Sequence, residues 1–180
     1  KYRSKGRLPA LSWLNAKTGA SITRCSQPLS GMTKKTSLDD ANLINAIREA
    51  QGSADAKLHL LDARPRANAI ANMAMGGGFE VMGGSAYSGC DLEFLNIGNI
   101  HVMRNSLSDL KSLLESQPYD NSFLARLEAS GWLLHISLIL QGAVKIVEHM
   151  QQRQSCVLHC SDGWDRTSQL SSVAMLLMDP

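Results

Sequence analysis

The feature that most constrains this chain of 180 residues is a short apolar strand that runs through a polar turn into an amphipathic helix. Residues 156–159 are expected to form the strand, and Cys160 ends it. Arg166 follows six residues later and opens the helix. A cysteine at a strand end, a turn that contains Gly163 and an arginine at a helix start predict a phosphate cradle with a nucleophile at its base. The alternative is a core cysteine beside an ordinary turn with a surface arginine.

The chemistry of phosphate transfer explains this spacing. Only a thiolate attacks well, and a free thiol with a pKa of about 8.5 is mostly protonated at neutral pH. Backbone N–H groups of the turn and of the helix N-terminus would lower the pKa of Cys160 and bind phosphate oxygens. Arg166 adds a planar fork that grips two of those oxygens. We therefore expect attack of Cys160 on phosphorus, a cysteinyl-phosphate intermediate and hydrolysis by water, without a metal or other cofactor.

The loop and its flanking residues, HCSDGWDRT at positions 159–167, resemble the active-site loop of the myotubularin family of phosphoinositide 3-phosphatases. Protein tyrosine phosphatases share the outer cysteine and arginine but not the interior of this loop. Further segments resemble the family from about Arg7 to the end of the chain, namely residues 8–13, 22–28, 62–65, 68–72, 76–80 and 99–104. The resemblance implies an α/β cysteine-phosphatase fold, similar to that of protein tyrosine phosphatases and incomplete here. Residues 1–180 would then be part of a longer myotubularin-type catalytic domain.

The same resemblance implies the roles of individual residues. Expelling an inositol alkoxide needs a proton donor, and the family places this acid at the position of Asp165. Asp162 is the alternative acid, although a helix N-cap or a ligand-orienting role suits it better. The substrate would be held by loop residues, by two asparagines and by the backbone of the residue that follows the second asparagine. These are Ser161, Asp162, Gly163, Trp164, Asp165, Arg166, Asn72, Asn99 and Ile100.

Further residues near the predicted site have roles outside the phosphate-binding loop chemistry. Arg64 and Arg66 flank a proline after a predicted strand, where an anion-binding role and a structural ion pair are equally open. His159 should face away from Cys160 across the strand and bond backbone groups around the loop. Trp164 is expected in the pocket wall, and the glycines at 76–78 are expected to form a flexible turn. The remaining histidines form no pattern of metal ligands.

The pattern along the chain alternates between strands and helices. Strands are expected at residues 8–15 and 20–25, as a hairpin, and at 57–61 and 92–97. Helices are expected from a capping box at Ser37 to Gly52, and at 66–75, 107–115 and 131–152. The most apolar run, 132–147, is shorter than the roughly 20 residues of a membrane span and is expected to be a buried helix. This alternation favours an α/β fold with a largely parallel central sheet and a ligand at the carboxyl ends of its strands.

Composition narrows the setting. A net charge of +2 is too small to argue for nucleic acid or an anionic membrane as a partner. The four cysteines lack zinc-like spacing, and reduced thiols suit the cytosol. Residues 1–9 are polar and basic, so no signal peptide is expected there. The resemblance implies peripheral binding to endosomal-type membranes that contain phosphoinositides, and homo- or hetero-oligomers with other myotubularins.

The expected activity is removal of the 3-phosphate from phosphatidylinositol 3-phosphate, with the 3,5-bisphosphate as a second substrate that these residues leave open. A catalytically inactive scaffold is the first alternative, but inactive family members lose the loop cysteine or arginine, and both are present. A protein tyrosine or dual-specificity phosphatase is the second. Two aspartates and a single arginine within the loop argue against it.

Overall fold

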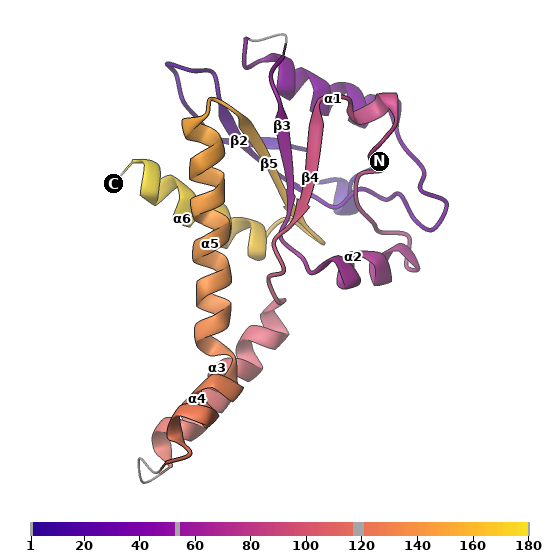
Figure 1. Ribbon diagram of the computed structural model, residues 1–180. Helices are drawn as coiled ribbons and strands as arrows, with labels where there is room; N and C mark the ends of the chain where they lie inside the picture. The colour runs from indigo at the N-terminus through magenta and orange to yellow at the C-terminus, as the bar shows by residue number, and fades with distance from the viewer. Residues whose placement is uncertain (1, 53–54, 117–120, 180) are drawn as a thin grey trace.

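A five-stranded mixed sheet forms the centre of the chain in a computed structural model, which describes residues 2–52, 55–116 and 121–179 (Figure 1). Its strands are β1 (Ala10–Leu14), β2 (Ser21–Ser26), β3 (Leu58–Asp62), β4 (Cys90–Phe94) and β5 (Ser155–Cys160). They lie in the order β1-β2-β5-β3-β4, and only β1 and β2 pair antiparallel. The α/β class and the largely parallel sheet predicted from the sequence are therefore confirmed.

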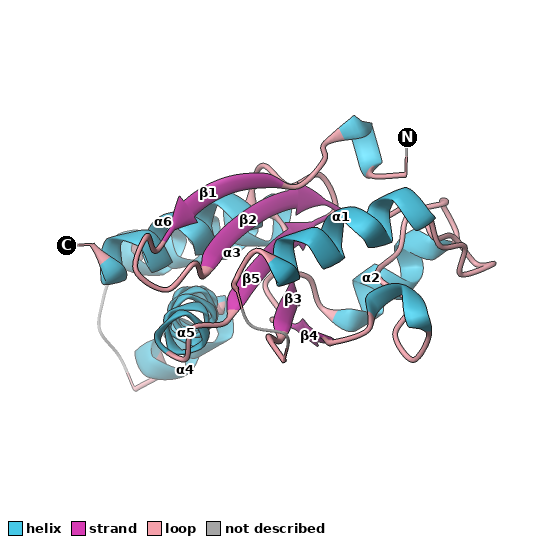
Figure 2. Cartoon of the chain, turned by 90° about the horizontal axis from the view of Figure 1, so that it is seen from above, coloured by secondary structure: helices cyan, strands magenta, loops and turns pink. Residues whose placement is uncertain are grey.

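The helices lie on both faces of the sheet. They are α1 (Leu38–Glu49), α2 (Arg66–Met73), α3 (Ile100–Glu115), α4 (Phe123–Ser130), α5 (Trp132–Gln151) and α6 (Arg166–Met178), with short 3-10 turns η1 (Ser4–Gly6) and η2 (Ser85–Tyr87). Figure 2 shows α5 and α6 on one side of the sheet and α1 on the other. Two apolar cores result, one between the sheet and the pair α5–α6, and one between the sheet and α1.

Strand β5 lies in the middle of the sheet, and all six of its residues are buried. Successive side chains alternate between the two cores, because side chains of a strand point to opposite faces in turn. Leu158 and Cys160 belong to the core under α5 and α6, whereas Val157 belongs to the core under α1. The parallel register pairs Ser26 of β2 with Cys160, so both strands end at the same edge.

The start of one helix agrees with the sequence prediction, and the start of another differs from it. Ser37 caps α1 as expected, because its hydroxyl accepts the backbone N–H of Asp40. Helix α3 begins at Ile100, well before the expected residue 107, since the Asn99 side chain accepts the N–H groups of His101 and Val102 and caps the helix there. Helices α3, α4 and the first part of α5 extend away from the sheet (Figure 1).

The prediction that residues 132–147 form a buried helix is wrong for one face of α5. The helix runs for 20 residues, which by length and composition alone would be enough to cross a membrane. Its inner face packs in the core through Gly142, Ala143, Ile146 and Met150. Its outer face carries exposed apolar side chains, namely Leu133, Leu134, Ile136, Leu140 and Val144. Composition indicated an apolar helix correctly, but it could not show which face the sheet covers.

Candidate active site

The predicted loop, residues 160–166, connects β5 to α6 at the carboxyl edge of the sheet. It rests on the end of β2. Gly163 has a φ of +75°, and a Cβ added there would lie 2.3 Å from the carbonyl oxygen of Cys25. No other residue type fits this close approach in a left-handed conformation. The backbone N–H of Gln27 also donates to the carbonyl of Ser161 at 3.2 Å. The loop is therefore shaped by β2 as well as by its own sequence.

Cys160 and Arg166 lie together at this loop, as the sequence predicted. The Cys160 side chain is buried, and the N–H of Gly163 donates to its Sγ at 3.3 Å. Burial by itself would raise the pKa of the thiol, but the Thr167 side chain, the charge of Arg166 and the amides of Gly163 and Thr167 outweigh it and lower that pKa. The loop thus favours a thiolate at Cys160.

The Arg166 guanidinium is buried and only partly used within the protein. Its two terminal nitrogens donate to the carbonyl of Ile97 and to the hydroxyl of Ser161, both at 3.4 Å. Its Nε has no hydrogen-bond partner among the residues that the structure describes. A buried cation with a free donor beside a thiolate is suited to an anion.

The two loop aspartates occupy different surroundings. Asp165 stands at the N-cap position of α6, so of the two roles left open for Asp162, the helix N-cap and ligand orientation, the N-cap of this helix is wrong. The Asp165 carboxylate does not cap the helix either, because it accepts the side-chain amide of Gln169 at 2.8 Å. Asp162 is tied to the N-terminal segment, where its carbonyl accepts from Arg7 at 2.7 Å and its carboxylate lies 3.5 Å from the hydroxyl of Ser4.

The structure brings one of the two predicted asparagines into hydrogen-bond contact with the loop. Asn72, in α2, donates from Nδ2 to the Ser161 hydroxyl at 3.1 Å. Asn99 instead uses its side-chain oxygen to cap α3, and Ile100 begins that helix, partly exposed. Trp164 is 54% exposed in the loop, so its expected place in a pocket wall stays a prediction.

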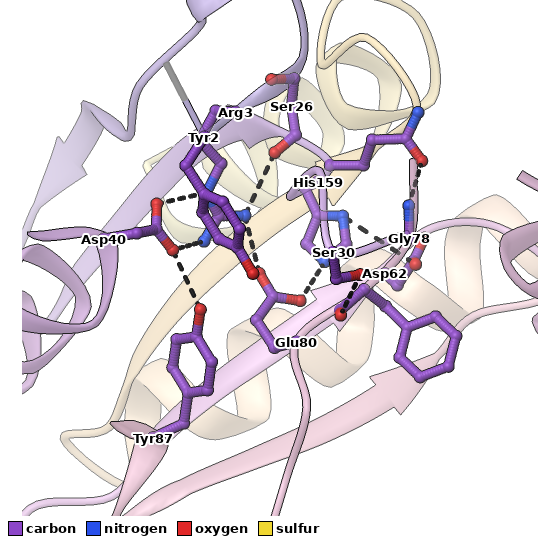
Figure 3. A network of polar contacts seen from close by, with 12 residues as sticks. Tyr2, Arg3, Ser26, Ser30, Asp40, Asp62, Gly78, Glu80, Tyr87 and His159 are labelled. Atoms are coloured by element: carbon purple, nitrogen blue, oxygen red, sulfur yellow. Dashed lines mark hydrogen bonds and ion pairs between the residues drawn. The ribbon is translucent and has the colours of Figure 1, made fainter. Parts of the chain in front are cut away.

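Behind the loop lies a buried ionic network that sequence reasoning missed (Figure 3). Arg3 bridges Asp40 and Glu80, with distances of 2.7 Å to each carboxylate. The other oxygen of Glu80 lies 2.9 Å from Nε2 of His159, and Asp62 lies 3.9 Å from Nδ1 of the same ring. The expectation that His159 bonds backbone groups is therefore wrong, since carboxylates surround it.

The network sets the ionisation of its members. Burial alone would lower the pKa of His159, but Glu80 and Asp62 outweigh it and raise that pKa. Burial would raise the pKa of Glu80, but His159 and Arg3 hold it well below its ordinary value. The residue next to Cys160 is thus held by an ion pair inside the protein. The only sequence signal for Glu80 was its place in the segment 76–80 that resembles the myotubularins.

Arg64 and Arg66 have different roles. Arg64 is fully buried and binds the Asp62 carboxylate at 2.6 Å, so of the two roles left open for it, the structural ion pair holds. Arg66 is exposed at the start of α2. The glycine turn that was expected to be flexible is instead closely packed at Gly78, whose carbonyl accepts from Arg64 at 2.7 Å.

The remaining titratable residues form no second centre in the described part of the chain. No group of three or more histidines, cysteines, aspartates or glutamates there could hold a metal ion. His59 and His149 stack on each other with ring centroids 3.5 Å apart. All four cysteines are free thiols.

Comparison with known proteins shows the family of this chain. A family model described as "Myotubularin-like phosphatase domain" matches residues 1–180. The chain is 47% identical to a myotubularin of Xenopus laevis and 46% identical to one of Rattus norvegicus, over 99% of this chain and 29% of each relative. It is also 46% identical to the phosphatidylinositol-3,5-bisphosphate 3-phosphatase MTMR2 of Mus musculus, over 99% of the chain and 27% of the relative. The chain thus spans less than a third of these relatives, and it belongs to the myotubularin-like phosphatase domain family.

Proposed function

We propose that this chain carries the catalytic centre of a phosphoinositide 3-phosphatase that removes the 3-phosphate from phosphatidylinositol 3-phosphate. The observation that carries the proposal is the Cys160 thiol, whose pKa is lowered, in one loop with a buried Arg166 that keeps a free donor. Family membership supports the substrate class, because the mouse relative is named a phosphatidylinositol-3,5-bisphosphate 3-phosphatase. The 3,5-bisphosphate is therefore a second proposed substrate.

The proposed reaction has two steps. The Cys160 thiolate attacks phosphorus, the bond from phosphorus to the inositol 3-oxygen breaks, and Asp165 donates a proton to the leaving alkoxide. Water then attacks the phosphocysteine, Asp165 takes its proton, and inorganic phosphate leaves with Cys160 again a thiolate. Arg166 and the loop amides bind the equatorial oxygens in both steps, where charge is concentrated.

We also propose that the substrate is bound by the other loop residues and, outside the loop, by Asn72, Asn99 and Ile100. Asn72 has the strongest support, because it already contacts the loop at Ser161. We also propose that the α/β sheet with its strand–loop–helix is the core of a protein tyrosine phosphatase-like fold within a longer catalytic domain. The whole protein would act peripherally on endosomal-type membranes from the cytosol, alone or in oligomers with other myotubularins. Four free thiols support the reducing compartment.

Phosphate release from short-chain phosphatidylinositol 3-phosphate, compared with a phosphotyrosine peptide, tests this proposal. We expect release from the lipid only, and its loss in Cys160→Ser, because serine is a far weaker nucleophile at neutral pH. Preference for the peptide would favour a protein tyrosine phosphatase. Absence of activity on both would favour the scaffold, and lipid activity that survives Cys160→Ser would overturn the mechanism.

The role of Asp165 is tested separately. Asp165→Asn should flatten the pH dependence that the general acid contributes to kcat/KM for the lipid, while Asp162→Asn should keep it. An unchanged profile in Asp165→Asn would move the acid to another residue.

A further inference from the structure

Gln27 immediately follows β2 and contacts the active-site loop through its backbone. Its N–H donates to the carbonyl of Ser161 at 3.2 Å. Its side chain is almost fully buried, so its amide must find partners inside the protein. None of the roles assigned so far uses this side chain.

The side-chain oxygen of Gln27 is surrounded by donors. It accepts from Arg64 at 2.5 Å and from the N–H of Gly78 at 3.1 Å, and Nδ2 of Asn72 lies 3.5 Å away. Arg64 is itself fixed by the carboxylate of Asp62. A guanidinium and a backbone N–H can only donate, so the oxygen of the amide must face them. The orientation of Gln27 is therefore fully determined.

The turn after α2 is packed onto this amide. Gly77 donates its N–H to the carbonyl of Asn72 at 2.9 Å. A Cβ added at Gly77 would lie 2.6 Å from the side-chain oxygen of Gln27, so the glycine lies flat against the amide. Gln27 thus holds Asn72 in two ways, directly through its oxygen and indirectly through the turn formed by Gly77 and Gly78.

Asn72 carries this constraint into the loop. Its Nδ2 donates to the hydroxyl of Ser161 at 3.1 Å, and the same hydroxyl accepts from Arg166 at 3.4 Å. We propose that Gln27 is a positioning residue that fixes Asn72 against Ser161, so that the Asn72 amide is aimed at the inositol ring next to the phosphate under attack. The inference rests on the proposed function, because it takes an inositol lipid as the substrate.

A comparison of two substrates tests this role in the full protein. Gln27→Met keeps the size of the side chain but removes the acceptor. We expect kcat/KM for short-chain phosphatidylinositol 3-phosphate to fall roughly tenfold more than kcat/KM for an aryl phosphate. The reason is that only the lipid has an inositol ring, whose hydroxyl groups Asn72 can bind. The double variant Gln27→Met with Asn72→Ala should lose no more lipid activity than Asn72→Ala alone, since Gln27 acts through Asn72.

A matched control separates positioning from loss of stability. Gln51 is a similarly buried glutamine whose amide accepts from the N–H of Ser155 and donates to two carbonyls, at the opposite end of β5. Gln51→Met should reduce the melting temperature without changing the ratio of lipid to aryl phosphate activity. If Gln27→Met does not fold, Gly77→Ala provides a second variant, because its Cβ displaces the Gln27 amide, and the same shift in the ratio is expected.

Several results would overturn the positioning role of Gln27. An unchanged ratio in both Gln27→Met and Gly77→Ala would overturn the inference, and so would losses that multiply in the double variant. An equal shift in Gln51→Met would show a merely structural role and overturn it as well. A wild-type protein that releases phosphate from the aryl phosphate but not from the lipid would overturn the proposed substrate and this inference with it. If the wild-type protein acts on the lipid but the ratio of lipid to aryl phosphate activity is unchanged in the two variants, the inference is overturned and the proposed function stands.

Discussion

At the scale of single residues, the loop is fixed by contacts that lie outside it. The hydroxyl of Ser161 accepts hydrogen bonds from Asn72 of α2 and Arg166 of α6. The backbone carbonyl of Ser161 accepts a third from the N–H of Gln27. Gly163 lies against the carbonyl of Cys25. The donors around Cys160 are thus oriented before any anion binds, which is the condition under which such donors stabilise charge most.

Cys160 should react with iodoacetamide at lower pH than the other cysteines. Burial raises the pKa of Cys25 to about 12 and that of Cys90 to about 11, and it raises that of Cys156 too. The loop lowers that of Cys160. Only thiolates are alkylated, so the Cys160 curve should rise through a midpoint below the ordinary value of 9.0, and the curves of the other three cysteines through midpoints above it. Mass spectrometry of peptides alkylated across a pH series measures each site.

Arg166→Met should move the Cys160 midpoint to higher pH, because it removes a positive charge that favours the thiolate. Arg24→Met is the control and should leave the midpoint in place, because Arg24 bonds the hydroxyl of Ser168 in the first turn of α6 and is not among the groups that lower the pKa of Cys160. A midpoint that does not move in Arg166→Met would contradict the electrostatic role of that arginine.

Gly163→Ala should greatly reduce phosphatase activity. The substitution places a Cβ against the Cys25 carbonyl and also disfavours a φ of +75°. Strain of this kind costs on the order of 1–3 kcal/mol before the clash is counted. Gly83→Ala is the matched control, because its φ is +90° but nothing lies within 4 Å of the added Cβ. Steady-state kinetics and melting temperature of both variants separate the clash from the backbone cost, and equal behaviour would refute the role of the close approach.

At the scale of the elements, α6 links the loop to the helical layer. Arg166 and Thr167 open α6, and Leu170, one turn further on, packs against α5 at Gly142. The inner face of α5 is therefore coupled to the loop through α6. Its exposed outer face has no such connection.

Gly142→Ala should destabilise the fold, because its Cβ would lie 2.6 Å from a methyl group of the fully buried Leu170. Overpacking of this kind costs roughly 1–3 kcal/mol. Val144→Ala removes atoms from the exposed outer face and should change the free energy of unfolding little. Urea titrations of the two variants compare them, and a larger effect of Val144→Ala would show that the outer face is covered in solution.

At the scale of the whole molecule, the buried network joins segments that are distant in the chain. Arg3 from the N-terminal segment meets Asp40 of α1 and Glu80, and Glu80 meets His159 of β5. Such a network is stable only when every charge is paired, since an unpaired buried charge is costly. It therefore ties the N-terminal segment to the strand that bears Cys160.

Glu80→Gln should reduce stability in a pH-dependent way. The pKa of Glu80 is depressed, so its contribution is present above the ordinary value of 4.5 and is lost as the pH falls. The pKa of His159 is raised, so its contribution is present below 6.5 and is lost as the pH rises through the folded value. Arg3, Asp62 and Arg64 also face this pair.

The cost of Glu80→Gln should therefore be greatest between pH 4.5 and 6.5, and roughly 3–5 kcal/mol there, as for the breaking of other buried pairs. It should be smaller above the raised folded pKa of His159, where the ring is neutral and only the pairing with Arg3 is lost. Urea unfolding of wild type and variant, between pH 4.5 and 6.5 and again at alkaline pH, measures this difference in cost. A cost that does not change with pH would contradict a charged His159.

Local features of this molecule could be predicted from the sequence, and distant contacts could not. Cys160, Gly163 and Arg166 lie within seven residues, so their spacing predicted the loop together with the apolar strand before them and the amphipathic helix after them. The partners of the buried network are separated by 37 to 79 residues, and no local pattern connects them. Asn72 and Asp165 were identified only through the resemblance to myotubularins.

The order of the strands has a consequence for how the molecule is made. Strand β5 pairs with β2 on one side and with β3 on the other, so before it is in place the sheet consists of two separate halves, β1–β2 and β3–β4. During synthesis these halves emerge early and must wait for β5, since contacts between residues so far apart form late. The strand that completes the sheet is also the strand that ends in Cys160. A ribosome-bound chain that stops before residue 155 therefore lacks both the finished sheet and the nucleophile.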